Sequence, residues 1–205
     1  MPNCRELLET ISEWLRQGTP GAEKLVDFPW EVSSDEKGLK AIYPRFPIDV
    51  VITCDDKLGV LRLSVQLQTE TFTLEKDVKL IVYHKFLRRN VAPLVKYSLT
   101  GDEDIPTLMV DLSTKTLGKD EFNDALAMLL AAVNDAIKML GLEEYYREAM
   151  FSKLLDLVKK HIEEGWSRED LYNYLVVNAG VKEEEAAEII DSLLEKERRK
   201  PSVYV

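Results

Sequence analysis

Residues 60–68 read Val-Leu-Arg-Leu-Ser-Val-Gln-Leu-Gln, and this stretch decides the fold class. Every second side chain is apolar: Leu61, Leu63, Val65 and Leu67. The side chains between them are polar: Arg62, Ser64, Gln66 and Gln68. Successive side chains of a strand point to opposite faces, so this strand packs on one side and meets water on the other. An antiparallel sheet with one covered face is therefore predicted.

The residues before this strand predict further strands and one helix. Ile48–Cys54 is rich in β-branched residues and leads through the turn Asp55–Gly59 into the central strand. Leu39–Tyr43 is a second extended segment, and Phe28–Val32 can form a short edge strand because Pro29 lacks an amide proton. Apolar residues at helical spacing predict a helix over Cys4–Gln17.

The residues after the central strand predict a helix over Leu74–Asn90 with Thr73 as its N-cap. Its main apolar stripe, expected in the core, consists of Leu74, Val78, Ile81, Val82 and Phe86. A second stripe consists of Leu80, Tyr83, His84, Leu87 and Val91. One apolar face is enough to pack on a sheet, so two stripes indicate a helix covered by its sheet and by something else.

A hairpin and a long helix complete this part of the chain. Leu94–Leu99 and Thr107–Leu112 flank a polar turn at 101–104, and Lys119–Leu140 is a helix closed by Gly141. The expected order is α-β-β-β-α-β-β-α. Runs of strands interrupted by single helices are typical of an α+β fold, with helices packed on one face of an antiparallel sheet.

The last sixty or so residues have only helical patterns. Helices are predicted over Glu143–Glu164, from Ser167 (with Asp170 in a capping pattern) to Gly180, and over Lys182–Arg199. We therefore expect an α+β domain at 1–142 and a three-helix module at 143–205.

Composition excludes several classes of protein. The net charge is −10, shared equally between the two predicted domains, so tight binding to nucleic-acid phosphates is not expected. The longest apolar run, Ala125–Val133, is too short to cross a membrane. The first residues lack the apolar core of a secretory signal, so the cytoplasm is the expected compartment. Cys4 and Cys54 are expected to be reduced thiols, and plentiful Lys and Glu with scarce Gln favour a thermophilic source.

The residue patterns predict no catalytic, cofactor-binding or metal-binding residues, and hence no enzyme. His84 and His161 have no His, Cys or Asp three or four residues further on, and the acidic clusters fall where turns belong. The patterns GxGxxG, GxxxxGK[ST] and GxSxG are missing. A small-molecule enzyme with a pocket under the sheet would need groups that no motif reveals.

The arrangement of residues 1–142 resembles the type III secretion chaperone-like fold. Four segments, 11–15, 28–30, 41–44 and 49–52, are similar to an archaeal domain family of that fold with no assigned activity. The resemblance implies a small dimeric domain that holds partner polypeptides on its surface. Residues 143–205 are similar to ubiquitin-associated-type three-helix modules, with Gly165-Trp166-Ser167 at their Gly-aromatic loop, which implies a protein-binding module.

These observations predict a non-enzymatic, chaperone-like protein that forms a homodimer and binds a protein partner. The predicted partner or dimer contacts are Leu80, Tyr83, Leu87 and Val91. The alternative is a transcription-associated DNA-binding protein that uses residues 167–178 and 182–199 as a helix-turn-helix. Against it, Glu183–Glu185 place acids where a recognition helix meets phosphates.

Overall fold

The computed structural model describes residues 3–35, 38–69 and 71–198. The chain divides into two compact units, one of residues 1–42 and 48–146, the other of residues 43–47 and 147–205. The predicted boundary after residue 142 stays a prediction.

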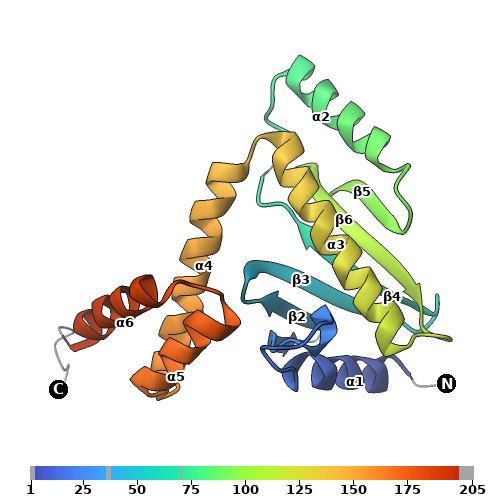
Figure 1. Ribbon diagram of the computed structural model, residues 1–205. Helices are drawn as coiled ribbons and strands as arrows, with labels where there is room; N and C mark the ends of the chain where they lie inside the picture. Colours follow the sequence, from blue (N-terminus) through green and yellow to red (C-terminus); the bar gives the residue numbers. More distant parts are fainter. Residues whose placement is uncertain (1–2, 36–37, 70, 199–205) are drawn as a thin grey trace, which may run out of the picture. The chain divides into compact units, whose positions relative to one another are not determined.

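Within the described residues, six strands form one sheet in the order β1-β2-β3-β4-β6-β5 (Figure 1). The strands are β1 Glu31–Asp35, β2 Gly38–Tyr43, β3 Phe46–Asp55, β4 Val60–Gln66, β5 Val95–Thr100 and β6 Ile105–Ser113. The fold class is the predicted one, but four strands, one more than the expected order contains, precede α2. The first strand also begins three residues later than expected. Residues 35–38 have the composition of a turn, and residues 36–37 lie outside the described residues.

The cross-strand register gives the sheet one covered face. Ile52 lies opposite Leu63, which lies opposite Val110, which in turn lies opposite Val95, and all four are buried. Between them, Ser64 faces Met109 on the other side of the sheet. The alternation predicted for residues 60–68 is confirmed in β4, because Leu61, Leu63 and Val65 are buried between more exposed neighbours.

The helices of the first unit are α1 Cys4–Arg16, the short 3₁₀ helix η1 Leu25–Asp27, α2 Lys76–Arg89 and α3 Lys119–Leu140. The bounds of α3 and its left-handed Gly141 cap are as predicted. It contacts β4, β5 and β6 and lies across the sheet in Figure 1. Its buried residues form the largest part of the core: Phe122, Ala125, Leu126, Leu129, Leu130, Val133, Ala136 and Ile137.

The cysteines correct a prediction. Cys4 and Cys54 form a disulfide with Cα atoms 5.5 Å apart, so they are not two free thiols. The bond joins the first residue of α1 to the end of β3, across 50 residues of sequence. The amide of Cys4 also donates to Asp56 Oδ1 over 2.8 Å, which fixes the same helix end to the turn after β3.

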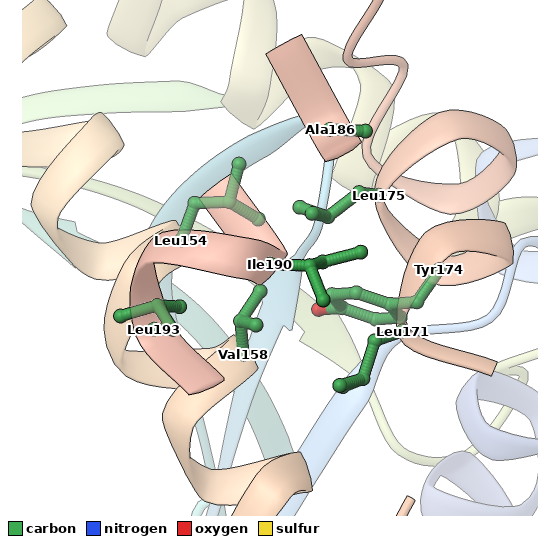
Figure 2. Close-up of a cluster of buried hydrophobic side chains, with 8 residues drawn as sticks. All are labelled: Leu154, Val158, Leu171, Tyr174, Leu175, Ala186, Ile190 and Leu193. Atoms are coloured by element: carbon green, nitrogen blue, oxygen red, sulfur yellow. The ribbon is translucent and has the colours of Figure 1, made fainter. Parts of the chain in front are cut away.

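The second unit is helical. Most of α4 Glu143–Glu163 belongs to it, followed by α5 Arg168–Asn173, the π-helical turn η2 Tyr174–Asn178 and α6 Glu183–Arg198. Ser167 and Asp170 form the predicted capping box. Figure 2 shows the side chains of its core converging: Leu154, Val158, Leu171, Tyr174, Leu175, Ala186, Ile190 and Leu193.

Candidate protein-interaction surface

Helix α2 is held on the first unit by few apolar side chains. Only Val82 and Phe86 of this helix are buried. The Phe86 ring meets the Tyr97 ring of β5 edge-on, with centroids 5.5 Å apart. Burial raises the pKa of Tyr97 because the phenolate would lose hydration. The apolar contact of α2 with the sheet is therefore narrow and limited to the β5 side.

Asn90 reinforces this contact at the end of α2. Its Nδ2 donates to the carbonyl of Tyr97 over 3.0 Å, and its Oδ1 accepts from the Tyr97 amide over 2.8 Å. The Asn90 side chain thus forms hydrogen bonds with the amide and carbonyl of Tyr97, which face away from β6. An open strand edge is a template for pairing with another chain, so Asn90 both ties down α2 and closes this edge.

Polar contacts hold the two halves of α2. In the first half, the Tyr83 hydroxyl donates to Asp104 over 2.6 Å, and Lys79 lies 3.6 Å from the same carboxylate. In the second half, Lys85 donates to the carbonyl of Met139 at the end of α3, where the helix dipole favours a cation. Arg89 forms an ion pair with Asp135 of α3. These contacts leave the outward side of α2 uncovered.

Large apolar side chains are exposed on and beside α2. They lie on several sides of the helix and beyond both of its ends, and we call them together the α2 surface: Phe72, Leu74, Val78, Leu80, Ile81, Leu87, Val91 and Leu94. Leu87 is 71% exposed and Val91 is 89% exposed, far above what a packed side chain shows. Single exposed leucines are ordinary, but eight large apolar side chains exposed on and around one helix make it a candidate interaction site.

The predicted contact residues have two different environments. Leu80, Leu87 and Val91 are exposed on the α2 surface. Tyr83 is half-buried, and its hydroxyl is engaged by Asp104. Their role as partner or dimer contacts stays a prediction.

The core stripe predicted for this helix is wrong in three of its five members. Leu74, Val78 and Ile81 are exposed and belong to the α2 surface, whereas Val82 and Phe86 are buried as expected. The N-cap is Glu75 rather than Thr73, and no side chain caps this end. Apolar residues occur on several sides of this helix. Their periodicity alone does not show which stripe packs on the sheet.

A second surface lies beside the other edge of the sheet. A groove of about 770 Å³ is lined by α1 and by the ends of β1, β2 and β3. The Trp30 amide donates to the Leu15 carbonyl, and Arg16 Nη2 donates to the Val32 carbonyl, each over 2.9 Å. Backbone groups two residues apart in a strand face the same way, so those of Ser34 also face this side. Among the described residues they have no partner there.

The histidines and acidic turn residues, which were considered as reactive groups, lie in ordinary structural environments. His84 is exposed on α2. His161 is buried in the second unit, and its ring stacks on Trp166 with centroids 3.9 Å apart. Its Nδ1 lies 3.1 Å from Glu164 Oε2. Asp55 accepts from the amides of Lys57 and Leu58, which is the ordinary work of an acidic turn residue. In the described part of the chain, no three metal-ligating side chains lie together.

The fold and the α2 surface define an α+β domain with an open sheet face and an uncovered helix. The family model for a domain of unknown function (DUF8183) matches residues 10–140, and the chain belongs to this family. A second model, HTH_78, also described as a domain of unknown function, matches residues 141–205. No curated protein matches the chain.

One similar solved structure is titled "Crystal Structure of the ExsC-ExsE Complex". The match has 15% identity and a TM-score of 0.47, and covers 69% of this chain and 96% of that chain. The archaeal source and the ubiquitin-associated resemblance stay predictions. No helix in the described ranges is both long enough and apolar enough to cross a membrane.

Proposed function

We propose that this protein is a non-enzymatic, chaperone-like homodimer of the cytoplasm that binds another polypeptide. The observation that carries the proposal is the α2 surface, whose large apolar side chains are exposed. Burying such side chains contributes roughly 25 cal/mol per Å² of apolar area removed from water. A second copy offers an identical apolar patch, and two-fold dimers join the same patch on both subunits.

The disulfide is compatible with this compartment under one condition. Cytoplasmic disulfides are rare in organisms of moderate temperature but common inside hyperthermophiles. The Lys and Glu content of the chain favours a thermophilic source, and the Cys4–Cys54 bond supports the same interpretation.

The groove beside β1 is the candidate site for the partner polypeptide. Ser34 turns its amide and carbonyl toward this groove, so an extended segment can add there as a further strand. Strand addition recognises backbone groups rather than particular side chains, which suits a chaperone-like role. Proteins captured from a cell extract by the wild-type chain should be lost with Ser34→Pro, which removes the outward amide while the dimer persists. Retention of the same proteins would contradict this site.

The dimer is tested by charging the α2 surface. The double variant Leu80→Glu/Leu87→Glu places four carboxylates in the proposed interface, and we expect it to sediment as a monomer with an unchanged circular dichroism spectrum. Leu58→Glu is the matched control, because Leu58 is 76% exposed in the turn after β3, outside the α2 surface. Its dimer should remain. A monomeric wild-type chain at micromolar concentration, or a dimeric double variant, would overturn the proposal.

The DNA-binding alternative rests on the helical succession of α5–η2 and α6, matched by the model named HTH_78. Over residues 183–195, where the structure describes the side chains, the exposed side of α6 carries mostly acids: Glu183, Glu184, Glu185, Glu188, Asp191 and Glu195. Carboxylates repel phosphates, so we expect no mobility shift of duplex DNA at low ionic strength. A salt-sensitive shift would instead favour this alternative.

A further inference from the structure

The Cys4–Cys54 disulfide lies in the wall of the groove beside β1. Both cysteines are half-buried rather than enclosed in the core. Disulfides that are covered by apolar packing resist exchange, whereas partly exposed ones are open to attack by thiolates. Ser34 lines the same groove, so a segment that adds to β1 there brings its own side chains near the disulfide.

The disulfide can open without unfolding α1. Three side chains of this helix are buried in the core: Leu7, Ile11 and Leu15. At the end of the helix, the Leu15 carbonyl accepts from the Trp30 amide, and Arg16 donates to the Val32 carbonyl. These contacts hold the middle and the end of α1 independently of the disulfide. Opening the bond therefore loosens only the first turn of the helix.

The two sulfurs have different surroundings once the bond breaks. Cys4 is the first residue of α1, where the helix dipole favours a negative charge such as a thiolate. Cys54 belongs to strand β3, and strands have only small dipoles. Asp56 opposes a thiolate, but it accepts from the Cys4 amide and is two residues from Cys54, so it disfavours both. Cys4 is therefore the better leaving group.

We propose that Cys4–Cys54 is a thiol–disulfide exchange site that captures a cysteine-bearing polypeptide lying in this groove. The thiolate of the polypeptide attacks Cys54 Sγ and forms a mixed disulfide, while the Cys4–Cys54 bond breaks and Cys4 leaves as a thiolate. The sulfur of the polypeptide is oxidised and that of Cys4 is reduced, so the exchange needs no other oxidant or reductant. The Cys4 thiolate takes up a proton from water, and its attack on the mixed disulfide releases the polypeptide again. This inference deepens the proposed function, because it rests on the groove as the site of the partner polypeptide.

Two thiol probes test the reaction: glutathione, and the pentapeptide Val-Thr-Cys-Thr-Val blocked at both ends, whose β-branched residues favour an added strand. Each probe is incubated with the oxidised full-length chain, and free thiols are then trapped with N-ethylmaleimide. Mass spectrometry of proteolytic fragments should find the probe on Cys54 and the maleimide on Cys4. At equal thiolate concentration, the pentapeptide should react about 10-fold faster than glutathione, because binding in the groove raises its local concentration. Ser34→Pro should lower the pentapeptide rate to that of glutathione.

The contrary outcomes separate the exchange site from the proposed function. If the disulfide of the folded chain is inert to both probes, although it exchanges in urea, the exchange site is wrong and non-covalent binding in the groove stands. Adducts on Cys4 instead of Cys54 overturn the direction of attack. Equal rates for the two probes contradict a polypeptide-binding groove, and with it that part of the proposed function.

The variant Cys4→Ser checks that the bond opens locally. It lacks the disulfide and should keep the circular dichroism spectrum of the oxidised wild-type chain, because the buried side chains of α1 remain in place. Its hydrogen exchange should accelerate in the first turn of α1 and stay slow at Ile11 and Leu15. An unfolded Cys4→Ser chain would show that the disulfide is required for the fold and would overturn the proposal.

Discussion

Helices α2 and α3 both contact β5, yet they bury very different fractions of their apolar side chains. Helix α3 has 22 residues, of which eight are buried. Helix α2 has 14 residues, of which two are buried. Helix α3 crosses three strands and also contacts η1, so both of its apolar flanks have something to cover. Helix α2 reaches only the β5 side of the sheet.

The difference shows that the sheet determines which apolar residues become core. A sheet with one covered face offers a limited apolar area, and α3 occupies most of it. The remaining apolar residues of α2 have no face left within the unit. They are exposed because the domain has no surface to offer them, although their residue types are those of a core helix. This makes α2 the natural place for contact with another chain.

The largest expected effect comes from truncating one leucine in each helix. Leu126 of α3 is fully buried, so Leu126→Ala should lower the free energy of unfolding by about 2–5 kcal/mol. Leu87 of α2 is largely exposed, so Leu87→Ala should change the stability of the monomer by less than about 0.5 kcal/mol. Urea unfolding, followed by circular dichroism, measures both.

The dependence of stability on protein concentration distinguishes a loss of core packing from a loss of dimerisation. Dimerisation adds to apparent stability by mass action, so the wild-type unfolding midpoint should rise with concentration. Leu87→Ala should reduce this dependence, whereas Leu126→Ala should lower stability at every concentration. Equal losses of stability for the two variants in dilute solution would mean that α2 is packed like α3.

The same two helices show what can be predicted from the sequence. The bounds of α3 are predicted correctly, because a long apolar pattern at helical spacing is followed by Gly141, which caps the helix. The pattern of α2 predicts a helix, but three of the five residues that it predicts to be core are exposed. Leu74, Val78 and Ile81 are as apolar as Val82 and Phe86, and only the position of β5 distinguishes them.

Contacts between residues far apart in the sequence could not be predicted from the sequence pattern. The alternation at residues 60–66 predicts both faces of β4, since that information is local. The Cys4–Cys54 disulfide depends on where α1 packs against the sheet, and a separation of 50 residues carries no such information. The same holds for Asn90 on Tyr97 and for Ser34 at the groove. Leu80 and Leu87 could be predicted as a candidate surface because a second apolar stripe is visible without coordinates.

A smaller effect is expected at the hinge between α2 and β5. Asn90→Ala removes two hydrogen bonds to the Tyr97 backbone and should lower stability by about 1–2 kcal/mol. The loss should be local, so that hydrogen exchange accelerates at α2 amides and leaves α3 protected. Asn123→Ala on α3 is the matched control, because Asn123 accepts one hydrogen bond from Val26 near η1. Uniform acceleration across both helices would show that α2 does not open separately.

The smallest effect concerns the uncovered face of the sheet, where an ion-pair cluster takes the place of a helix. Asp111 of β6 accepts from Arg62 Nε over 2.6 Å and from Arg62 Nη2 over 2.9 Å. It also accepts from Lys96 over 2.6 Å. Hydrogen bonds from Arg62, together with Lys96, lower the pKa of Asp111 to about 2. The side chain of Asp111 is 19% exposed, while both cations are about half exposed.

The lowered pKa gives stability a defined dependence on pH. Above about pH 4 the carboxylate is ionised in both the folded and the unfolded chain, and its contribution is complete. As the pH falls from about 4 to about 2, the unfolded chain takes up the proton first, so this contribution is lost. Allowing for screening of the exposed cations, it amounts to about 1–2 kcal/mol. Other carboxylates titrate in the same range, so the informative quantity is the difference in unfolding free energy between the wild type and Asp111→Asn. This difference should shrink toward pH 2 and at high salt, and a difference that stays constant with pH would mean that packing, not charge, holds Asp111 in place.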